Sequence, residues 1–193
     1  LAGEDTLIYD GSNSVTVDLL TGELTVETGG SLSLLGVEDA VGANAGDILR
    51  GNNASNFFSG GVGDDLLVGR GGDDILSGGA GSDEYQYSSN DGSDLIIENG
   101  AAEDTDVLQL IDISAADIRV SRLSGSYDLT ITITSTNEII TIQDHFLDPA
   151  NAIETILFAD ETEWSNEDIL ANLDQAPAVN PSDEFYTTAE DTP

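Results

Sequence analysis

Acidic and amide side chains recur every nine residues in the first half of this 193-residue chain. Each of these side chains lies five residues after a glycine and two residues before a large apolar residue. The five residues are Asp47, Asn56, Asp65, Asp74 and Asp83. Their hard oxygen atoms suit Ca²⁺ better than Mg²⁺, because Ca²⁺ accepts about six to eight oxygens in flexible geometry. The chain has no cysteine and one histidine, so a zinc or copper site is not expected. The spacing therefore predicts binding of a hard divalent cation.

The glycines share this period, and the clearest copies form a recognisable repeat. Residues 60–86 read GGVGDDLLV, GRGGDDILS and GGAGSDEYQ, which fit the pattern G-G-x-G-x-D-x-U-x with U a large apolar residue. This pattern resembles the RTX calcium-binding nonapeptide repeat. The resemblance implies an all-β fold, a right-handed parallel β-roll (or β-helix) with calcium between its turns. The first six residues of each copy would form a turn, and the last three a short strand.

In that family two nonapeptides make one coil, so turns on the same side recur every eighteen residues. The resemblance thus places Asp47, Asp65 and Asp83 in one column and Asn56 and Asp74 in the opposite one. Coils stack at about 4.8 Å, and like charges ~5 Å apart repel by about 3 kcal/mol at an effective dielectric constant near 20. A cation between the turns would offset this repulsion. We therefore expect about two to five Ca²⁺ ions and a disordered metal-free chain.

The resemblance also assigns ligands by position. Each ion would bind carbonyls from positions two and four and the side chain at position six of one turn. The turn eighteen residues later would add carbonyls from positions one and three and its own side chain at position six. The first two predicted sites consist of Ala43, Ala45, Asp47, Gly60, Val62 and Asp65, and of Gly61, Gly63, Asp65, Gly78, Ala80 and Asp83. On the opposite side they consist of Asn52, Ala54, Asn56, Gly69, Gly71 and Asp74, and of Arg70, Gly72, Asp74, Ser89, Asp91 and Asp94.

Several residues depart from the repeat pattern. Asn56 lacks a charge, so its site is expected to be weaker. Ala43, Asn52 and Arg70 stand at position two, where the pattern has glycine, and a side chain there is expected to strain the turn. A two-residue insertion at 87–88 makes the fourth site the least regular.

Position seven of the repeats is also apolar in several copies, at Ile48, Phe57, Leu66 and Ile75. These residues could simply form an exposed strand face. Alternatively, they could form a stripe covered by a flanking segment or a partner. We expect this same chain to cover it.

Composition restricts the partners. The chain has 38 acidic and 4 basic residues, which makes nucleic acid and anionic membranes poor partners. The 39% hydrophobic content predicts that the neutralised chain folds. The absence of cysteine excludes a disulfide framework but not an extracellular location, where calcium is abundant. No long apolar run is present, so no membrane span is expected.

The sequence divides into four segments. Residues 1–41 contain short strands, which predict either the first coils of the roll or a separate N-terminal cap of antiparallel hairpins. Residues 42–97 are the calcium-binding repeats. Residues 98–173 predict a mainly β capping segment with a short helix after Ser165. Residues 174–193 hold three of the four prolines, so they are expected to link to a following cadherin-like or immunoglobulin-like repeat.

The third segment carries a second resemblance. The strings GSDLIIENG, DVLQL, SAADIRVSRL, DLTITI, ITIQDHFL and IETILFADETEW occur in this order between residues 92 and 164. They resemble the region that follows the repeats in haemolysin-type calcium-binding proteins. In that family the segment covers the last coil and promotes calcium-driven folding.

We interpret the chain as a calcium-binding structural module of a secreted bacterial surface protein, in our first hypothesis an adhesin, and not as an enzyme. The resemblance implies type I secretion and folding on extracellular calcium. His145 is expected to have a packing role, and no catalytic motif occurs. The alternatives are a glycan- or peptide-binding module and the non-catalytic tail of a secreted enzyme. Besides calcium, a host-surface, glycan or peptide ligand is a candidate partner, and we expect a monomeric module within a longer chain.

Overall fold

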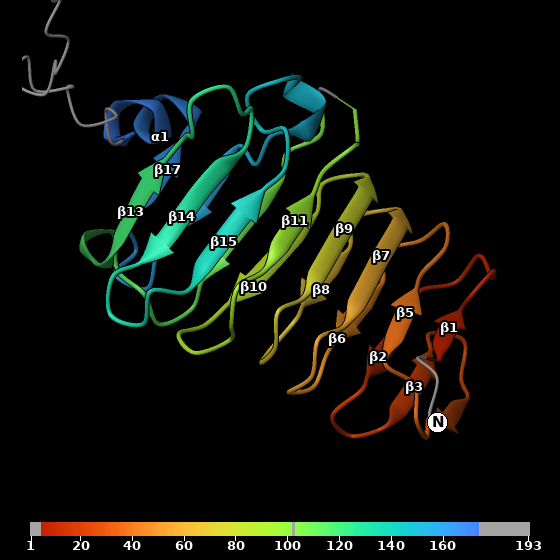
Figure 1. The fold of residues 1–193 in the computed structure, drawn as a ribbon. Coiled ribbons are helices and arrows are strands. Elements are labelled where there is room, and N and C mark those ends of the chain that lie inside the picture. Colours follow the sequence, from red (N-terminus) through yellow and green to blue (C-terminus); the bar gives the residue numbers. More distant parts are fainter. Residues whose placement is uncertain (1–4, 102, 174–193) are drawn as a thin grey trace, which may run out of the picture.

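Two β-sheets face each other and account for most of the molecule (Figure 1). The computed structural model describes residues 5–101 and 103–173, and the predicted linker at 174–193 lies outside them. In these residues the first sheet has eight strands and the second has nine. The protein is thus mostly β, as the sequence predicts, with a short α-helix near the end of the described chain.

The strands are short. In spatial order, the first sheet contains β1 (Thr6–Ile8), β5 (Asp39–Val41), β7 (Phe57–Val62), β9 (Ile75–Ala80), β11 (Leu95–Ile97), β15 (Ile139–Ile142), β14 (Leu129–Ile133) and β13 (Ile118–Ser121). The second sheet contains β17 (Glu163–Ser165), β16 (Thr155–Leu157), β12 (Val107–Leu110), β10 (Glu84–Tyr87), β8 (Leu66–Val68), β6 (Ile48–Arg50), β2 (Val15–Asp18), β3 (Glu23–Val26) and β4 (Ser31–Ser33). The helix α1 is Asn166–Asn172, and two 3₁₀ turns are η1 (Ala115–Asp117) and η2 (Pro149–Asn151).

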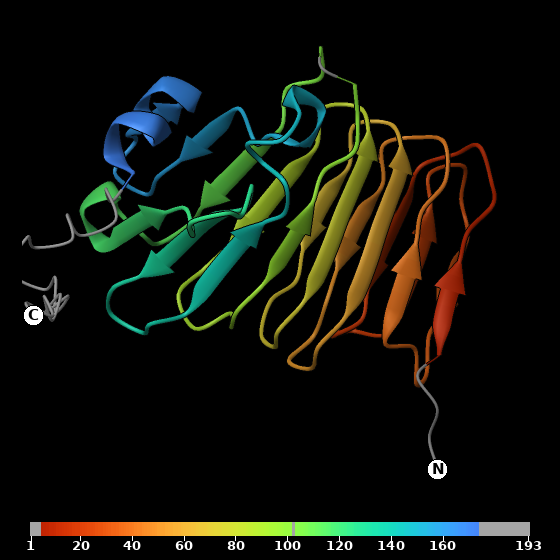
Figure 2. The ribbon, with the colours of Figure 1, turned by 45° about the horizontal axis from the view of Figure 1, so that its top comes forward.

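From β5 to β12 the chain alternates between the two sheets, and neighbouring strands within each sheet are parallel (Figure 2). Leu67 pairs with Leu49 on one side and Tyr85 on the other, and Phe58 pairs with Leu76. Each of these pairs spans eighteen residues, so one circuit of the chain consumes two nonapeptides. This winding is compatible with the predicted roll.

Antiparallel strands occur at both ends, so the sheets are mixed rather than wholly parallel. At the N-terminal end β2 joins β6 in parallel, and β3 and β4 then extend the sheet as antiparallel strands. At the other end β15, β14 and β13 form an antiparallel meander, and β16 pairs with β17. These strands continue the sheets beyond the repeats, where the regular coil no longer supplies pairing partners.

The core lies between the sheets, where the apolar residue of each repeat points inward. Leu49, Phe58 and Leu67 have no exposed surface, and Leu76 and Tyr85 are 2% and 1% exposed. Because strand side chains alternate between faces, the flanking residues of each strand point outward. The inward rows stack from coil to coil and so fix the register of the turns that join the strands.

The inserted residues at 87–88 are accommodated by lengthening β10. Tyr87 is buried, and its hydroxyl donates to the Gly92 carbonyl at 2.6 Å and to Glu138 at 3.2 Å. Glu138 also accepts the Asn90 N–H at 3.0 Å. The last repeat turn is thereby attached to the meander that follows.

The helix α1 begins with a capping box formed by Ser165 and Asp168. No helix in the described residues is long and apolar enough to cross a membrane.

Candidate metal centres

The side chains at position six stack on the second sheet's side in what we term the first column: Asp47, Asp65, Asp83 and Asp106. The Asp47 N–H donates to Asp65 Oδ1 at 2.6 Å, and the Asp65 N–H donates to Asp83 Oδ1 at 2.8 Å. The Asp83 N–H continues the series to Asp106 Oδ1 at 2.8 Å. One carboxylate oxygen of each aspartate is therefore held by the backbone of the preceding coil.

The second column, on the opposite side, consists of Asn56, Asp74 and Asp94. The Asn56 N–H donates to Asp74 Oδ1 at 2.7 Å, and the Asp74 N–H donates to Asp94 Oδ1 at 3.0 Å. The last step spans twenty residues instead of eighteen, because the insertion at 87–88 lies within it. Asp94 nevertheless keeps its place, so the predicted members of both columns do stack.

The second oxygens of three aspartates lack a donor. Oδ2 of Asp65, Asp74 and Asp83 is buried without a hydrogen-bond partner among the described residues. The three residues are 3%, 1% and 1% exposed. A buried carboxylate is costly unless it is paired or bound to a metal. These unpartnered oxygens fit the predicted cation, since they are hard ligand atoms that no donor satisfies.

Asp47 and Asn56, in the first two turns, differ. Asp47 Oδ2 accepts the Ala43 N–H, and Asn56 Oδ1 accepts the Asn52 N–H, both at 3.0 Å. The Asn56 amide group also donates to the Glu38 carbonyl at 2.7 Å. The first two turns thus satisfy their own position-six side chains, whereas the later turns do not.

The first two turns differ from the later ones because their residues at position two have a different backbone conformation. Gly61 and Gly79 have φ of 114° and 111°, where a side chain is strained. Arg70 also has a positive φ, 64°, as predicted for a residue replacing glycine. Ala43 and Asn52 avoid this region among the described residues, so the strain expected of them was wrong. Without the left-handed turn, their N–H groups reach the position-six side chain.

Arg70 compensates for its strained backbone through its side chain. Its guanidinium donates to both oxygens of Asp18 at 2.9 and 2.8 Å and to the Gly51 carbonyl at 2.7 Å. The hydrogen bond from Arg70 lowers the pKa of Asp18 from 3.8 to about 2. This bidentate pair ties β2 to the turn between β8 and β9.

Glycine at position one has a different role. Its φ is not left-handed, but a Cβ on Gly60 would collide with Oδ2 of Asp65, and a Cβ on Gly69 would collide with Oδ2 of Asp74. Gly78 is equally restricted by Asp83. The glycine therefore makes room for the carboxylate of its own turn.

Burial raises the pKa of the carboxyls in the later turns of both columns. The pKa of Asp65, Asp74 and Asp83 rises from 3.8 to about 7, and that of Asp94 to about 8. Burial is the largest cause; backbone hydrogen bonds oppose it, and nearby carboxylates add to it. At neutral pH the columns therefore need either protons or a cation.

The turns with the predicted carbonyl ligands also stack. Gly61 and Val62 pair with Gly79 and Ala80 across β7 and β9. The Val62 N–H donates to the Ala43 carbonyl at 2.8 Å, so that carbonyl is already in use in the first predicted site. Backbone ligands from turns eighteen residues apart are thus adjacent, which the predicted ligand sets require.

In the fourth predicted site, two side chains are engaged elsewhere. Asp91 Oδ2 accepts the Ser88 N–H at 2.7 Å, and Ser89 Oγ donates to Asp112 at 2.6 Å. Their carbonyls, which are the predicted ligands, are not involved in these two bonds. Asp94 alone among the side chains of this last turn joins the column.

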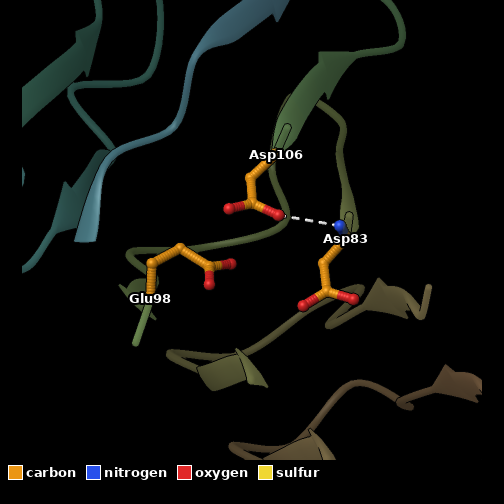
Figure 3. Close-up of side chains that lie close together, drawn as sticks. All are labelled: Asp83, Glu98 and Asp106. Carbon is orange, nitrogen blue, oxygen red and sulfur yellow. Dashed lines mark hydrogen bonds between the residues drawn. The ribbon is translucent and has the colours of Figure 1, made fainter. Parts of the chain in front are cut away.

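Sequence reasoning missed two buried acidic residues. Asp106 continues the first column twenty-three residues after Asp83, and Glu98 lies beside both (Figure 3). Burial raises the pKa of Asp106 to about 7 and that of Glu98 to about 9. Asp106 precedes the inward Leu108 by two residues, as repeat aspartates do, and this signal could have revealed it. The irregular distance from Asp83 concealed it.

His145 is held in the core of the last segment. It is 5% exposed, and its Nδ1 accepts the Ile153 N–H at 3.2 Å. Its ring packs edge-on against the Phe146 ring, with 4.6 Å between the two ring centroids. Burial lowers its pKa to about 4, so the ring is neutral at physiological pH. These contacts agree with the predicted packing role.

Two of the four position-seven residues are exposed in the part of the chain that the structure describes, whereas Ile48 and Leu66 are partly buried. Phe57 and Ile75 are 39% and 38% exposed. The expectation that this chain covers them was therefore wrong for residues 5–101 and 103–173. Both lie on the outer face of the first sheet, where an apolar strand residue needs no partner.

Two family models match the chain at these features. Residues 42–85 match the RTX calcium-binding nonapeptide repeat (4 copies), and residues 128–168 match the haemolysin-type calcium binding protein related domain. No curated protein matches the chain. The chain thus carries a calcium-binding module of the kind found in secreted bacterial proteins. Specifically, it contains RTX repeats followed by the haemolysin-type region, which confirms both resemblances.

Proposed function

We propose that residues 42–97 form a right-handed β-roll that binds Ca²⁺ between successive turns on both sides. Two ions would lie in the first column and two in the second, at the four ligand sets predicted from the repeat. The ions would supply the positive charge that the columns lack. The site of Asn56 would be the weakest, because its side chain is neutral and already engaged by Asn52 and Glu38.

One observation carries this proposal. The Oδ2 atoms of Asp65, Asp74 and Asp83 are buried and have no donor in the described chain. Aspartate and backbone carbonyl oxygens favour Ca²⁺ over Mg²⁺, which demands a tight octahedron and retains its water. A calcium ion would satisfy these oxygens and join adjacent coils.

The biological role that we propose is structural. With a net charge of −34, the metal-free chain would remain unfolded in the cell and pass through a type I secretion channel. Extracellular calcium would then fold and stiffen it, since even weak sites, with Kd of about 10⁻⁴–10⁻³ M, are filled there. The module would serve as a spacer or a support in a secreted adhesin.

Each of the other segments would have its own part in this structural role. Residues 98–173 would act as a cap, because β15 and β16 pair with β11 and β12 and cover edges that the repeats would leave open. Residues 1–41 would start the roll, and residues 174–193 would lead to the next module.

Calcium counting tests the metal sites. Equilibrium dialysis with atomic absorption should find about two to five calcium ions per chain, and excess Mg²⁺ should not displace them. A chain that binds no calcium while folded would contradict the proposal.

A glycan array tests the structural role. The calcium-loaded chain should give no signal, whereas the same array with a known lectin gives its usual signal. A calcium-dependent signal from the chain would favour a ligand-binding module instead.

A further inference from the structure

Three carboxylates gather where the last repeat meets the following segment. Asp83 precedes β10, Asp106 precedes β12 and Glu98 follows β11. Each offers one oxygen, and these oxygens lie within 4.8 Å of one another. Figure 3 shows the three carboxylates turned toward a common space.

The cluster is buried and incompletely satisfied. Asp83, Glu98 and Asp106 are 1%, 2% and 3% exposed. Oδ2 of Asp83 and Oε2 of Glu98 have no hydrogen-bond partner in the described chain. The one ion pair among the described residues, Arg70 with Asp18, joins β2 to the turn between β8 and β9. Three buried carboxylates at this distance require a compensating cation or protons.

Glu98 is an addition to the repeat pattern. It stands two residues after the inward Ile96, where earlier coils have Gly60 after Phe58 and Gly78 after Leu76. The glycines leave room for a carboxylate, whereas Glu98 brings one of its own. This turn lies beyond the nonapeptide match, which ends at residue 85.

Tyr85 holds Glu98 in place. Tyr85 occupies an inward position that is leucine in the neighbouring strands, at Leu67 and Leu108. Its hydroxyl donates to Glu98 Oε1 and accepts the Gly78 N–H at 2.7 Å. Oε1 is occupied in this way, and Oε2 remains buried without a hydrogen-bond partner in the described chain. The phenol thus preorganises the glutamate as a ligand.

We propose that Asp83, Glu98 and Asp106 bind an additional Ca²⁺ ion, which closes the first column outside the nonapeptide repeats. The site rests on the proposed function in that it extends the same column by one ion. Its three carboxylates exceed the one or two of each repeat site, so it should retain calcium longest during chelation. It would fasten the crossing between β11 and β12 to the last repeat.

The test uses the full chain and a matched pair of variants. Glu98→Gln removes one charge but keeps the acceptor for Tyr85, whereas Glu103→Gln removes one charge from an exposed position of the same loop. Equilibrium dialysis should show one fewer ion per chain for Glu98→Gln and no change for Glu103→Gln. Equal calcium numbers and affinities for the wild type and Glu98→Gln would overturn the inference.

Two further results separate this inference from the proposed function. If Asp65→Asn loses calcium and Glu98→Gln does not, the repeat sites stand and the additional site fails. If only Glu98→Gln loses calcium, the additional site stands and the repeat sites fail. If the Glu98→Gln variant does not fold, anomalous scattering from wild-type crystals grown with calcium tests the additional site instead. A peak among the three carboxylates supports the site, and none there overturns it.

Discussion

Acid should partly replace calcium in folding this protein. Five buried column carboxyls carry the effect: Asp65, Asp74, Asp83, Asp94 and Asp106. Their pKa in the folded, metal-free chain is about 7, or about 8 for Asp94, whereas 3.8 is the ordinary value. The folded state therefore binds more protons than the unfolded state between about pH 4 and pH 8, and stability falls as pH rises through that window.

The magnitude follows from the same pKa values. A carboxyl whose pKa is 3.8 unfolded and about 7 folded loses roughly 2–3 kcal/mol of stability between pH 5 and pH 8. Five such groups sum to roughly 10–15 kcal/mol before solvent screening reduces the figure, which is comparable to the whole stability of a typical domain. Asp18, whose pKa is lowered to about 2, stays ionised throughout this range and contributes nothing to the change.

The assay is far-ultraviolet circular dichroism with sedimentation velocity. We expect a compact β-protein at pH 8 with calcium, an expanded chain at pH 8 with chelator, and a compact β-state again in metal-free buffer at pH 5. Sodium chloride at pH 8 serves as the control for general charge screening. Retention of the folded state at pH 8 after complete chelation, with an unchanged melting temperature, would refute the reasoning.

Three further predictions concern single side chains. Asp65→Asn should reduce the number of bound calcium ions by calorimetry, whereas Asp64→Asn should not, because Asp64 is exposed and lies outside the column; equal losses would contradict the column assignment. Gly69→Ala should destabilise the calcium-loaded protein by about 1–3 kcal/mol in urea, while Gly71→Ala, whose Cβ meets nothing closer than 3.4 Å, should be tolerated. Arg70→Gly keeps a residue suited to positive φ but removes the ion pair, so amide exchange at residues 15–18 should accelerate; unchanged exchange there would show that the pair does not hold β2.

The contacts where the two sheets continue past the repeats could not be predicted from sequence. The ladder partners of β11 and β12 lie in β15 and β16, far along the chain. The Glu154 carboxylate accepts the Asp106 N–H across 48 residues. Nothing in the local sequence specifies such distances, because hairpins and 3₁₀ turns of irregular length intervene.

The sequence by itself determined the repeating unit. A glycine, an aspartate and an inward apolar residue at fixed offsets give the turns of residues 60–86 the same spacing, so Asp65 and Asp83 must stack. Only the tertiary structure decided what meets the last coil: Glu98 and Asp106 join Asp83 through a turn that breaks the period. A local period dictates neighbours at regular intervals, whereas contacts across irregular loops depend on how the whole chain packs.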